Sequence, residues 1–151
     1  MRTLHVGLRV ADPARSVAFY SAVGYEVVGR VPESGLGALT MLKLPDDEFV
    51  TLELVHRADT DAVNPTGLNH LVVAVDDVHA LASRLHTAGF DVEPPSSPDA
   101  SDDFWTAWVT DPDGYRLELV QWPPGHPVGL TRRDLAPTDD TSTREETDEH
   151  A

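Results

Sequence analysis

Apolar and polar residues alternate along several short segments of the chain, and this period of two predicts β-strands. In residues 4 to 10 the apolar side chains stand at even positions, whereas His5 and Arg9 stand at odd positions and face the opposite side. Similar segments predict further strands at Tyr25 to Val31, Leu36 to Leu44, Phe49 to His56, near Val92, Phe104 to Thr110 and Tyr115 to Trp122. The apolar face of the first strand suits a core covered by helices, which leaves His5 and Arg9 on the other side.

Two further segments are predicted to be short amphipathic helices, each following a strand. The first begins at Asp12, whose carboxylate can cap a helix that opens with proline, and it ends at Gly24. The second is capped by Asp76 or Asp77 and ends at Gly89, with an apolar stripe along one face. Each half of the chain therefore contains a strand, a helix and three strands.

The second half of the sequence repeats the first when the chain is shifted by 65 positions. His5 then falls on His70 and Glu53 on Glu118, and no net gap is needed. Further matches are Val10 with Val75, Asp12 with Asp77, Gly24 with Gly89, Val27 with Val92 and Asp46 with Asp111. The sequence predicts an α+β fold of two tandem βαβββ modules, residues 1–57 and 68–122, joined by a linker at 58–67 and forming a curved mixed sheet.

Composition excludes several classes of function. The chain has no cysteine, so disulfides, zinc–thiolate sites and thiol nucleophiles are excluded, and any metal must be bound by nitrogen and oxygen. A formal net charge of −15 argues against binding to nucleic acids or anionic membranes. The sequence shows no signal peptide or membrane span, so we expect a cytoplasmic protein with one domain over residues 1–122. Residues 123–151 are acidic and poor in large apolar side chains, which predicts a disordered tail.

The repeated polar residues predict a metal site. Glu53 and Glu118 lie in alternating segments, and they become neighbours of His5 and His70 if the first and fourth strands of each module pair. Two imidazoles and two carboxylates suit zinc, nickel, cobalt, manganese or iron(II). A single histidine or glutamate on a strand is usually only a surface residue. Four at matched positions favour a metal site, because repeating a core does not require repeating polar residues.

Other candidate site residues are less specific. Phe104, Trp105 and Trp108 belong to one predicted strand, where they could form the wall of a substrate pocket or simply pack in the core. Arg9 shares a face with His5, so it could bind an anionic substrate or form a structural salt bridge.

Several segments resemble the vicinal oxygen chelate superfamily, which includes glyoxalases, bleomycin resistance proteins and extradiol dioxygenases. These segments, within residues 3–122, are His5-Val-Gly-Leu-Arg-Val-Ala-Asp, Phe19-Tyr20-Ser-Ala-Val-Gly24-Tyr, Leu-Glu53-Leu, Asn-His70-Leu-Val-Val and Asp111-Pro-Asp-Gly-Tyr-Arg-Leu-Glu118-Leu. Within the superfamily the chain is most similar to glyoxalase I. The metal ligands of that enzyme, in the order His, Glu, His, Glu, are matched by His5, Glu53, His70 and Glu118.

The resemblance implies one divalent metal ion per site, most often nickel or zinc, and a site commonly completed across a homodimer interface. It also implies a small-molecule substrate, the hemithioacetal of a 2-oxoaldehyde and a thiol, which is isomerised through an enediolate with the metal as Lewis acid. Glu118 is the expected main base and Glu53 the base for the opposite face, and a carboxylate has to loosen from the metal to take a proton. Arg9 matches the family's arginine that meets the γ-glutamyl end of glutathione.

Two positions depart from the glutathione-dependent enzymes. This chain has Arg57 where they carry asparagine, and Ala100 among acidic residues where they carry a basic residue. An acidic loop there would repel the glycine carboxylate of glutathione. The resemblance therefore leaves the thiol open, and a different vicinal-oxygen substrate also remains possible.

Two alternative functions share the expected fold. A non-catalytic protein of the bleomycin resistance type could hold a cationic aromatic drug against Trp105 and Trp108, but it would not need four metal ligands. An extradiol dioxygenase uses two histidines and one glutamate on iron(II). In that enzyme Glu53 would obstruct the positions that the substrate and dioxygen need.

Overall fold

The computed structural model, which describes residues 1–59 and 62–135, contains the order strand, helix and three strands twice. The first module consists of β1 (Val6–Arg9), α1 (Pro13–Val23), β2 (Glu26–Val31), β3 (Ala38–Lys43) and β4 (Leu52–His56). The second consists of β5 (Leu71–Ala74), α2 (Val78–Thr87), β6 (Asp91–Val92), β7 (Trp105–Thr110) and β8 (Arg116–Gln121), preceded by the 3-10 helix η1 (Pro65–Gly67) in the linker. The predicted elements are confirmed, but most strands are shorter than predicted, so His5 and His70 each lie just before a strand.

The helix starts follow the capping signals in the sequence. Asp12 accepts a hydrogen bond from the N–H of Ala14 at 2.9 Å, and Asp77 accepts one from the N–H of Ala80 at 2.8 Å. Asp77 is therefore the cap of α2, which settles the choice between Asp76 and Asp77. The helix α1 ends at Gly24, where a φ of 129° favours glycine.

Each module forms its own four-stranded mixed sheet, with the orders β1-β4-β3-β2 and β5-β8-β7-β6. β1 pairs with β4 in parallel, and β5 pairs with β8 in the same way. Gly7 lies opposite Glu53 in the first sheet, and Val72 lies opposite Glu118 in the second. The predicted pairing of the first and fourth strands is confirmed, and one chain contains two sheets.

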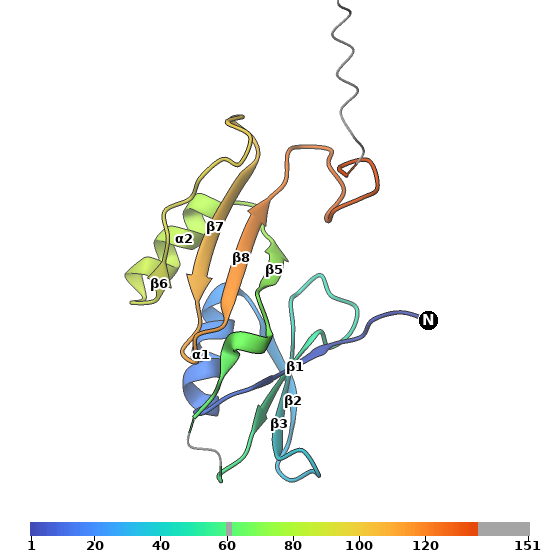
Figure 1. Cartoon of the computed structure of the whole chain (residues 1–151), viewed down its shortest axis with the longest axis vertical. Helices are drawn as coiled ribbons and strands as arrows, with labels where there is room; N and C mark the ends of the chain where they lie inside the picture. Colours follow the sequence, from blue (N-terminus) through green and yellow to red (C-terminus); the bar gives the residue numbers. More distant parts are fainter. Residues whose placement is uncertain (60–61, 136–151) are drawn as a thin grey trace, which may run out of the picture.

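The two modules share one hydrophobic core, in which the helices lie together on the same side of the sheets (Figure 1). Phe19 of the first module meets Phe90 of the second edge to face, with ring centroids 5.2 Å apart. The buried hydroxyl of Tyr20 donates a hydrogen bond of 2.8 Å to Asp111, and the hydroxyl of Tyr115 donates one of 3.0 Å to the carbonyl oxygen of Arg9. The helix-facing sides of both sheets are thus buried in the shared core. The opposite sides of the sheets face away from this core.

The residues after β8 continue away from the sheet. Trp122 stacks between Phe104 and His126, and His126 pairs with Asp134 at 2.9 Å. The hydrogen bond to Asp134 is the main cause that raises the pKa of His126. The pKa of Asp134 is lowered chiefly by the hydrogen bond from the backbone N–H of Thr131 and next by that from His126. The greater part of the predicted tail, residues 136–151, lies outside the described residues. Within the described part of the chain, no helix has the length and apolar character needed to cross a membrane.

Candidate metal centre

The first half-site consists of His5 and Glu53, which adjacent strands bring together. Nε2 of His5 lies 3.7 Å from Oε2 of Glu53. Since β1 and β4 are parallel neighbours, the residue before β1 and the second residue of β4 are carried to the same outer face. The side chain of His5 is 40% exposed, whereas that of Glu53 is only 9% exposed. The imidazole is therefore open to solvent and the carboxylate is largely enclosed.

The second half-site repeats this arrangement with His70 and Glu118. Nε2 of His70 again lies 3.7 Å from Oε2 of Glu118, and the two side chains are 33% and 23% exposed. The ring of Trp108 meets the imidazole edge to face at a centroid distance of 5.1 Å. Nδ1 of His70 lies 2.6 Å from the side-chain oxygen of Asn69. This half-site therefore has more side-chain contacts than the first.

The structure brings the four predicted ligands together as two pairs and not as one cluster. Among residues 1–59 and 62–135, no three His, Cys, Asp or Glu side chains lie close enough to hold one ion. Structural and catalytic sites for ions such as zinc generally use three or four protein ligands. One chain in this arrangement thus offers two half-sites, each with one imidazole and one carboxylate.

Each half-site fits a divalent metal ion by its chemistry. Metal bonds to imidazole nitrogen and carboxylate oxygen are about 2.0–2.2 Å long, so two of them can bridge roughly 4 Å. The separation of 3.7 Å in each pair lies within that reach and is too long for a hydrogen bond. The facing nitrogen and oxygen atoms are therefore free to accept an ion, and two half-sites together would supply four ligands.

The strands that directly follow the two histidines, β1 and β5, stand at open edges of their sheets. The backbone N–H groups of Val6 and Val75 donate to the neighbouring strands at 3.1 and 2.8 Å. Because alternate residues of a strand point to opposite sides, the N–H groups of Gly7 and Val72 point outward at matched positions. Both edges can accept another strand.

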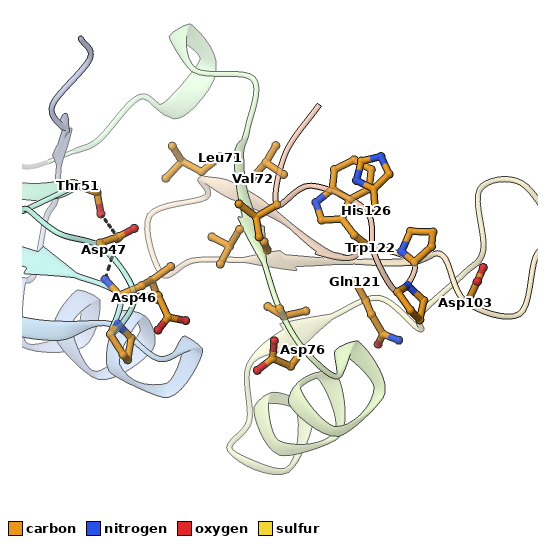
Figure 2. A pocket seen from close by; sticks show the side chains of 18 of the residues that line it. Asp46, Asp47, Thr51, Leu71, Val72, Asp76, Asp103, Gln121, Trp122 and His126 are labelled. Atoms are coloured by element: carbon orange, nitrogen blue, oxygen red, sulfur yellow. Dashed lines mark hydrogen bonds between the residues drawn. The ribbon is translucent and has the colours of Figure 1, made fainter. Parts of the chain in front are cut away.

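An open groove with a volume of about 910 Å³ runs along the outer edge of β5. Figure 2 shows Val72 in the middle, with Asp47 and Thr51 on one side and Trp122 and His126 on the other. The side chain of Val72 is 55% exposed and lines this groove. The groove therefore leaves an apolar strand edge uncovered beside the second half-site.

The remaining predicted site residues fall on different faces. Arg9 is exposed at the outer edge of β1, on the face of His5. Trp108 lies opposite Glu118 and faces the same side, next to His70. Trp105 instead packs against His79 of α2, with ring centroids 4.6 Å apart, so it faces the core side. The structure thus gives Trp108, but not Trp105, a place beside the half-site.

Two residues near the second half-site were not identified from the sequence. The guanidinium of Arg116 lies 4.4 Å from the ring centre of Trp108 and pairs with Glu93. The second of these residues is Asn69, whose side-chain oxygen contacts Nδ1 of His70. Arg116 stands two positions before Glu118, so the period of two could have placed it on the same face. For Asn69 the only available signal was its position directly before a predicted ligand.

Comparisons with known proteins identify the family of the chain and agree with its fold. A family model described as Glyoxalase/Bleomycin resistance protein/Dioxygenase superfamily matches residues 2–119. A lactoylglutathione lyase of Neisseria meningitidis is 33% identical over 126 residues, and the match covers 80% of this chain and 91% of that protein.

Similar solved structures include a glyoxalase I mutant from Zea mays, with a TM-score of 0.72 and 27% identity over 81% of this chain. The match spans 45% of the maize chain, so this chain corresponds to less than half of that larger protein's length. The trypanothione-dependent glyoxalase I of Leishmania major has a TM-score of 0.67 and 26% identity, with 80% of this chain and 86% of that one covered.

Proposed function

Since the chain belongs to the glyoxalase/bleomycin resistance protein/dioxygenase superfamily, we propose that it is a metal-dependent lyase or isomerase of the glyoxalase I type. Its substrate would be the hemithioacetal of a 2-oxoaldehyde and a thiol. The observation that carries the proposal is the pair of matched half-sites, in which His5 meets Glu53 and His70 meets Glu118 at the same 3.7 Å. Relatives named lactoylglutathione lyase at about 30% identity support it.

The four side chains of the two half-sites would hold one divalent ion. Nickel or zinc is the expected metal, and cobalt, manganese or iron is also compatible with nitrogen and oxygen ligands. When bound, such an ion acts as a Lewis acid toward two adjacent oxygens of the substrate.

A homodimer would complete the site. One chain keeps its half-sites apart, and the strands that follow the two histidines, β1 and β5, each have an open edge. If β1 of one protomer lies beside β5 of its partner, the first half-site of one chain faces the second half-site of the other. Such pairing would also cover Val72 in the groove of Figure 2.

Glu118 is the proposed base that removes the C1 proton of the hemithioacetal. The base has to leave its resting position and reach the substrate. The side chain of Glu118 is 23% exposed and that of Glu53 is 9% exposed, so Glu118 has more freedom to do so. Loss of the C1 proton gives an enediolate. Return of a proton to C2, with transfer of the hydroxyl proton from the C1 oxygen to the C2 oxygen, gives the thioester of a 2-hydroxy acid. Glu53 would serve the opposite face of the substrate.

Arg9 and Trp108 would contact the substrate around the reacting carbons. Arg9 is an exposed cation on the face of the first half-site, suited to a carboxylate of the thiol. Trp108 borders the second half-site and offers an apolar wall. Arg57, at the position where glutathione-dependent enzymes carry asparagine, pairs with Asp59 at 2.9 Å. We therefore keep the thiol open within this substrate class.

The first experiment measures bound metal after exposure of the metal-free protein to nickel, zinc, cobalt and manganese. About one tightly bound ion per site in the wild type, and its loss in His70→Ala, is expected. Absence of any bound ion would contradict the proposal and favour a ligand-binding protein of the same fold.

Mixing two inactive variants tests whether the site lies between chains. His5→Ala and His70→Ala each lose one ligand from every site. If the site is shared, a mixed dimer holds one site that lacks both histidines and one intact site, so metal binding and activity return on mixing. If each chain forms its own site, mixing restores nothing.

The reaction itself is tested by solvent deuterium exchange at C1 or C2 of hemithioacetals made from methylglyoxal and a panel of thiols. Exchange that needs both metal and Glu118 is the expected result. Lack of exchange with every thiol, in protein that has bound its metal, would refute the reaction but not the metal site.

A further inference from the structure

The two half-sites differ in the residue that precedes the histidine. Asn69 precedes His70, whereas Leu4 stands at the matched position before His5. Leucine has no side-chain acceptor, and asparagine has a carbonyl oxygen that accepts hydrogen bonds. The repeat therefore keeps the metal ligands of both modules but gives only one of them a polar neighbour in this position.

The contact between Asn69 and His70 favours one of the two ring nitrogens as the site of the proton. Nδ1 of His70 lies 2.6 Å from Oδ1 of Asn69, and this oxygen can only accept. The proton of a neutral imidazole then sits on Nδ1, and the lone pair sits on Nε2. Nε2 is the atom that faces Glu118 at 3.7 Å, a distance beyond hydrogen bonding, as expected when both atoms present lone pairs.

The opposite orientation of the amide would give the opposite result. An amide N–H directed at Nδ1 would place the proton of the neutral ring on Nε2, where it would block metal binding. The two arrangements can therefore be distinguished by experiment in protein that contains no metal.

The imidazole of His70 is also held by an aromatic contact. Trp108 meets the ring edge to face at 5.1 Å, and Arg116 lies against the indole while it pairs with Glu93. These contacts limit rotation of the ring, and the hydrogen bond to Asn69 selects its tautomer. Together these contacts orient the histidine of the second half-site more firmly than that of the first.

We propose that Asn69 is a positioning residue that holds His70 with the lone pair of Nε2 directed at the metal position beside Glu118. This inference rests on the proposed function, because it assigns a role toward the metal. Residues that hydrogen-bond to a ligating histidine fix its tautomer and orientation, and their loss typically weakens metal binding about 10-fold to 100-fold.

The first test is the tautomer of His70 in the metal-free, ¹⁵N-labelled full chain, from long-range ¹H–¹⁵N correlations of the imidazole rings. The signals of His70 are assigned by their loss in His70→Gln. We expect the Nδ1–H form in the wild type and in Asn69→Asp, which keeps an acceptor. Asn69→Leu, which copies the first module, should shift the ring toward the Nε2–H form. His5 is the internal control, and its signals should not respond.

The second test is the affinity for Ni²⁺ and Co²⁺, measured by competition with a chelator. Asn69→Leu should bind about 10-fold to 100-fold more weakly, and Asn69→Asp should bind at least as tightly as the wild type. Asn69→Ala serves as a second variant, and because residue 69 is exposed, neither change should disturb folding.

The Nε2–H form in the wild type would overturn the proposal, as would an unchanged tautomer and affinity in Asn69→Leu. If the tautomer responds as expected but no variant binds metal, the proposed function fails while the control of the tautomer by Asn69 stands.

Discussion

Replacement of Tyr20 by phenylalanine tests the contact that joins the two modules in the core. The hydroxyl of Tyr20 donates a hydrogen bond of 2.8 Å to Oδ2 of Asp111, and both residues are buried. A hydrogen bond to a charged group contributes about 1.5–3 kcal/mol. Without the hydroxyl, Asp111 loses this contribution, and in the described part of the chain its side chain keeps only the hydrogen bonds from the backbone N–H groups of Asp113 and Tyr115. Tyr20→Phe should therefore lower the free energy of unfolding by about 2 kcal/mol at neutral pH. For a chain of this length, that corresponds to a fall in Tm of about 4–8 °C.

The same substitution has a predicted pH dependence. Burial raises the pKa of Asp111, and the hydrogen bond from Tyr20 opposes that rise. A raised pKa means that the folded state holds the proton more tightly than the unfolded state, so stability is lost as pH rises through the folded pKa. Tyr20→Phe raises this pKa further. The loss of stability should therefore be largest at neutral pH and should shrink once acid protonates Asp111.

Urea denaturation followed by tryptophan fluorescence, at one protein concentration and without metal, measures both effects. Tyr25→Phe is the matched control, because Tyr25 packs edge to face on Tyr20 but forms no hydrogen bond through its hydroxyl in the described part of the chain. A change below about 0.5 kcal/mol is expected for this control. The reasoning would be refuted if Tyr20→Phe behaved like Tyr25→Phe, or if its cost grew toward acid pH.

Two further substitutions test local features of the modules, again by urea denaturation. Gly37→Ala should cost about 2 kcal/mol or more, because Gly37 has a φ of 124° and a methyl group there would clash with the carbonyl oxygen of His56 in the adjacent strand. Gly35→Ala, where a methyl group meets nothing within 4 Å, should be nearly neutral, and equal effects would count against this explanation. Asp77→Ala removes the cap of α2 and should cost about 1 kcal/mol. The neighbouring Asp76→Ala should cost much less, and the reverse order would show that the wrong cap was assigned.

The sequence predicted the fold well because its signals are local and occur twice. Period-two segments and capping residues determine the strands and helices, and the shift of 65 positions shows that both halves have the same order. The pairing of His5 with Glu53 followed from the parallel neighbours β1 and β4. The boundaries were less accurate, since an alternating pattern continues into residues that form no ladder.

The sequence could not predict whether the four ligands meet within one chain. That depends on how the modules pack, which the contact of Phe19 with Phe90 and the rest of the core determine. The different faces on which Trp105 and Trp108 lie could have been predicted from the sequence. They stand three positions apart in one strand, so the period of two places them on opposite faces.

The contacts between the modules affect the order in which the protein can fold during synthesis. The N–H of Ala11, in the short connection between β1 and α1, donates a hydrogen bond to Asp113 at 3.2 Å. The carbonyl oxygen of Arg9 accepts a hydrogen bond from the hydroxyl of Tyr115. Asp113 and Tyr115 are synthesised about a hundred residues after Ala11 and Arg9. The first module is therefore complete before its hydrogen-bond partners in the second module have been made. We expect the core face of the first module, which includes Phe19, to stay partly uncovered until the second module is complete. A repeat that resembles two independent units in sequence should therefore fold as a single unit.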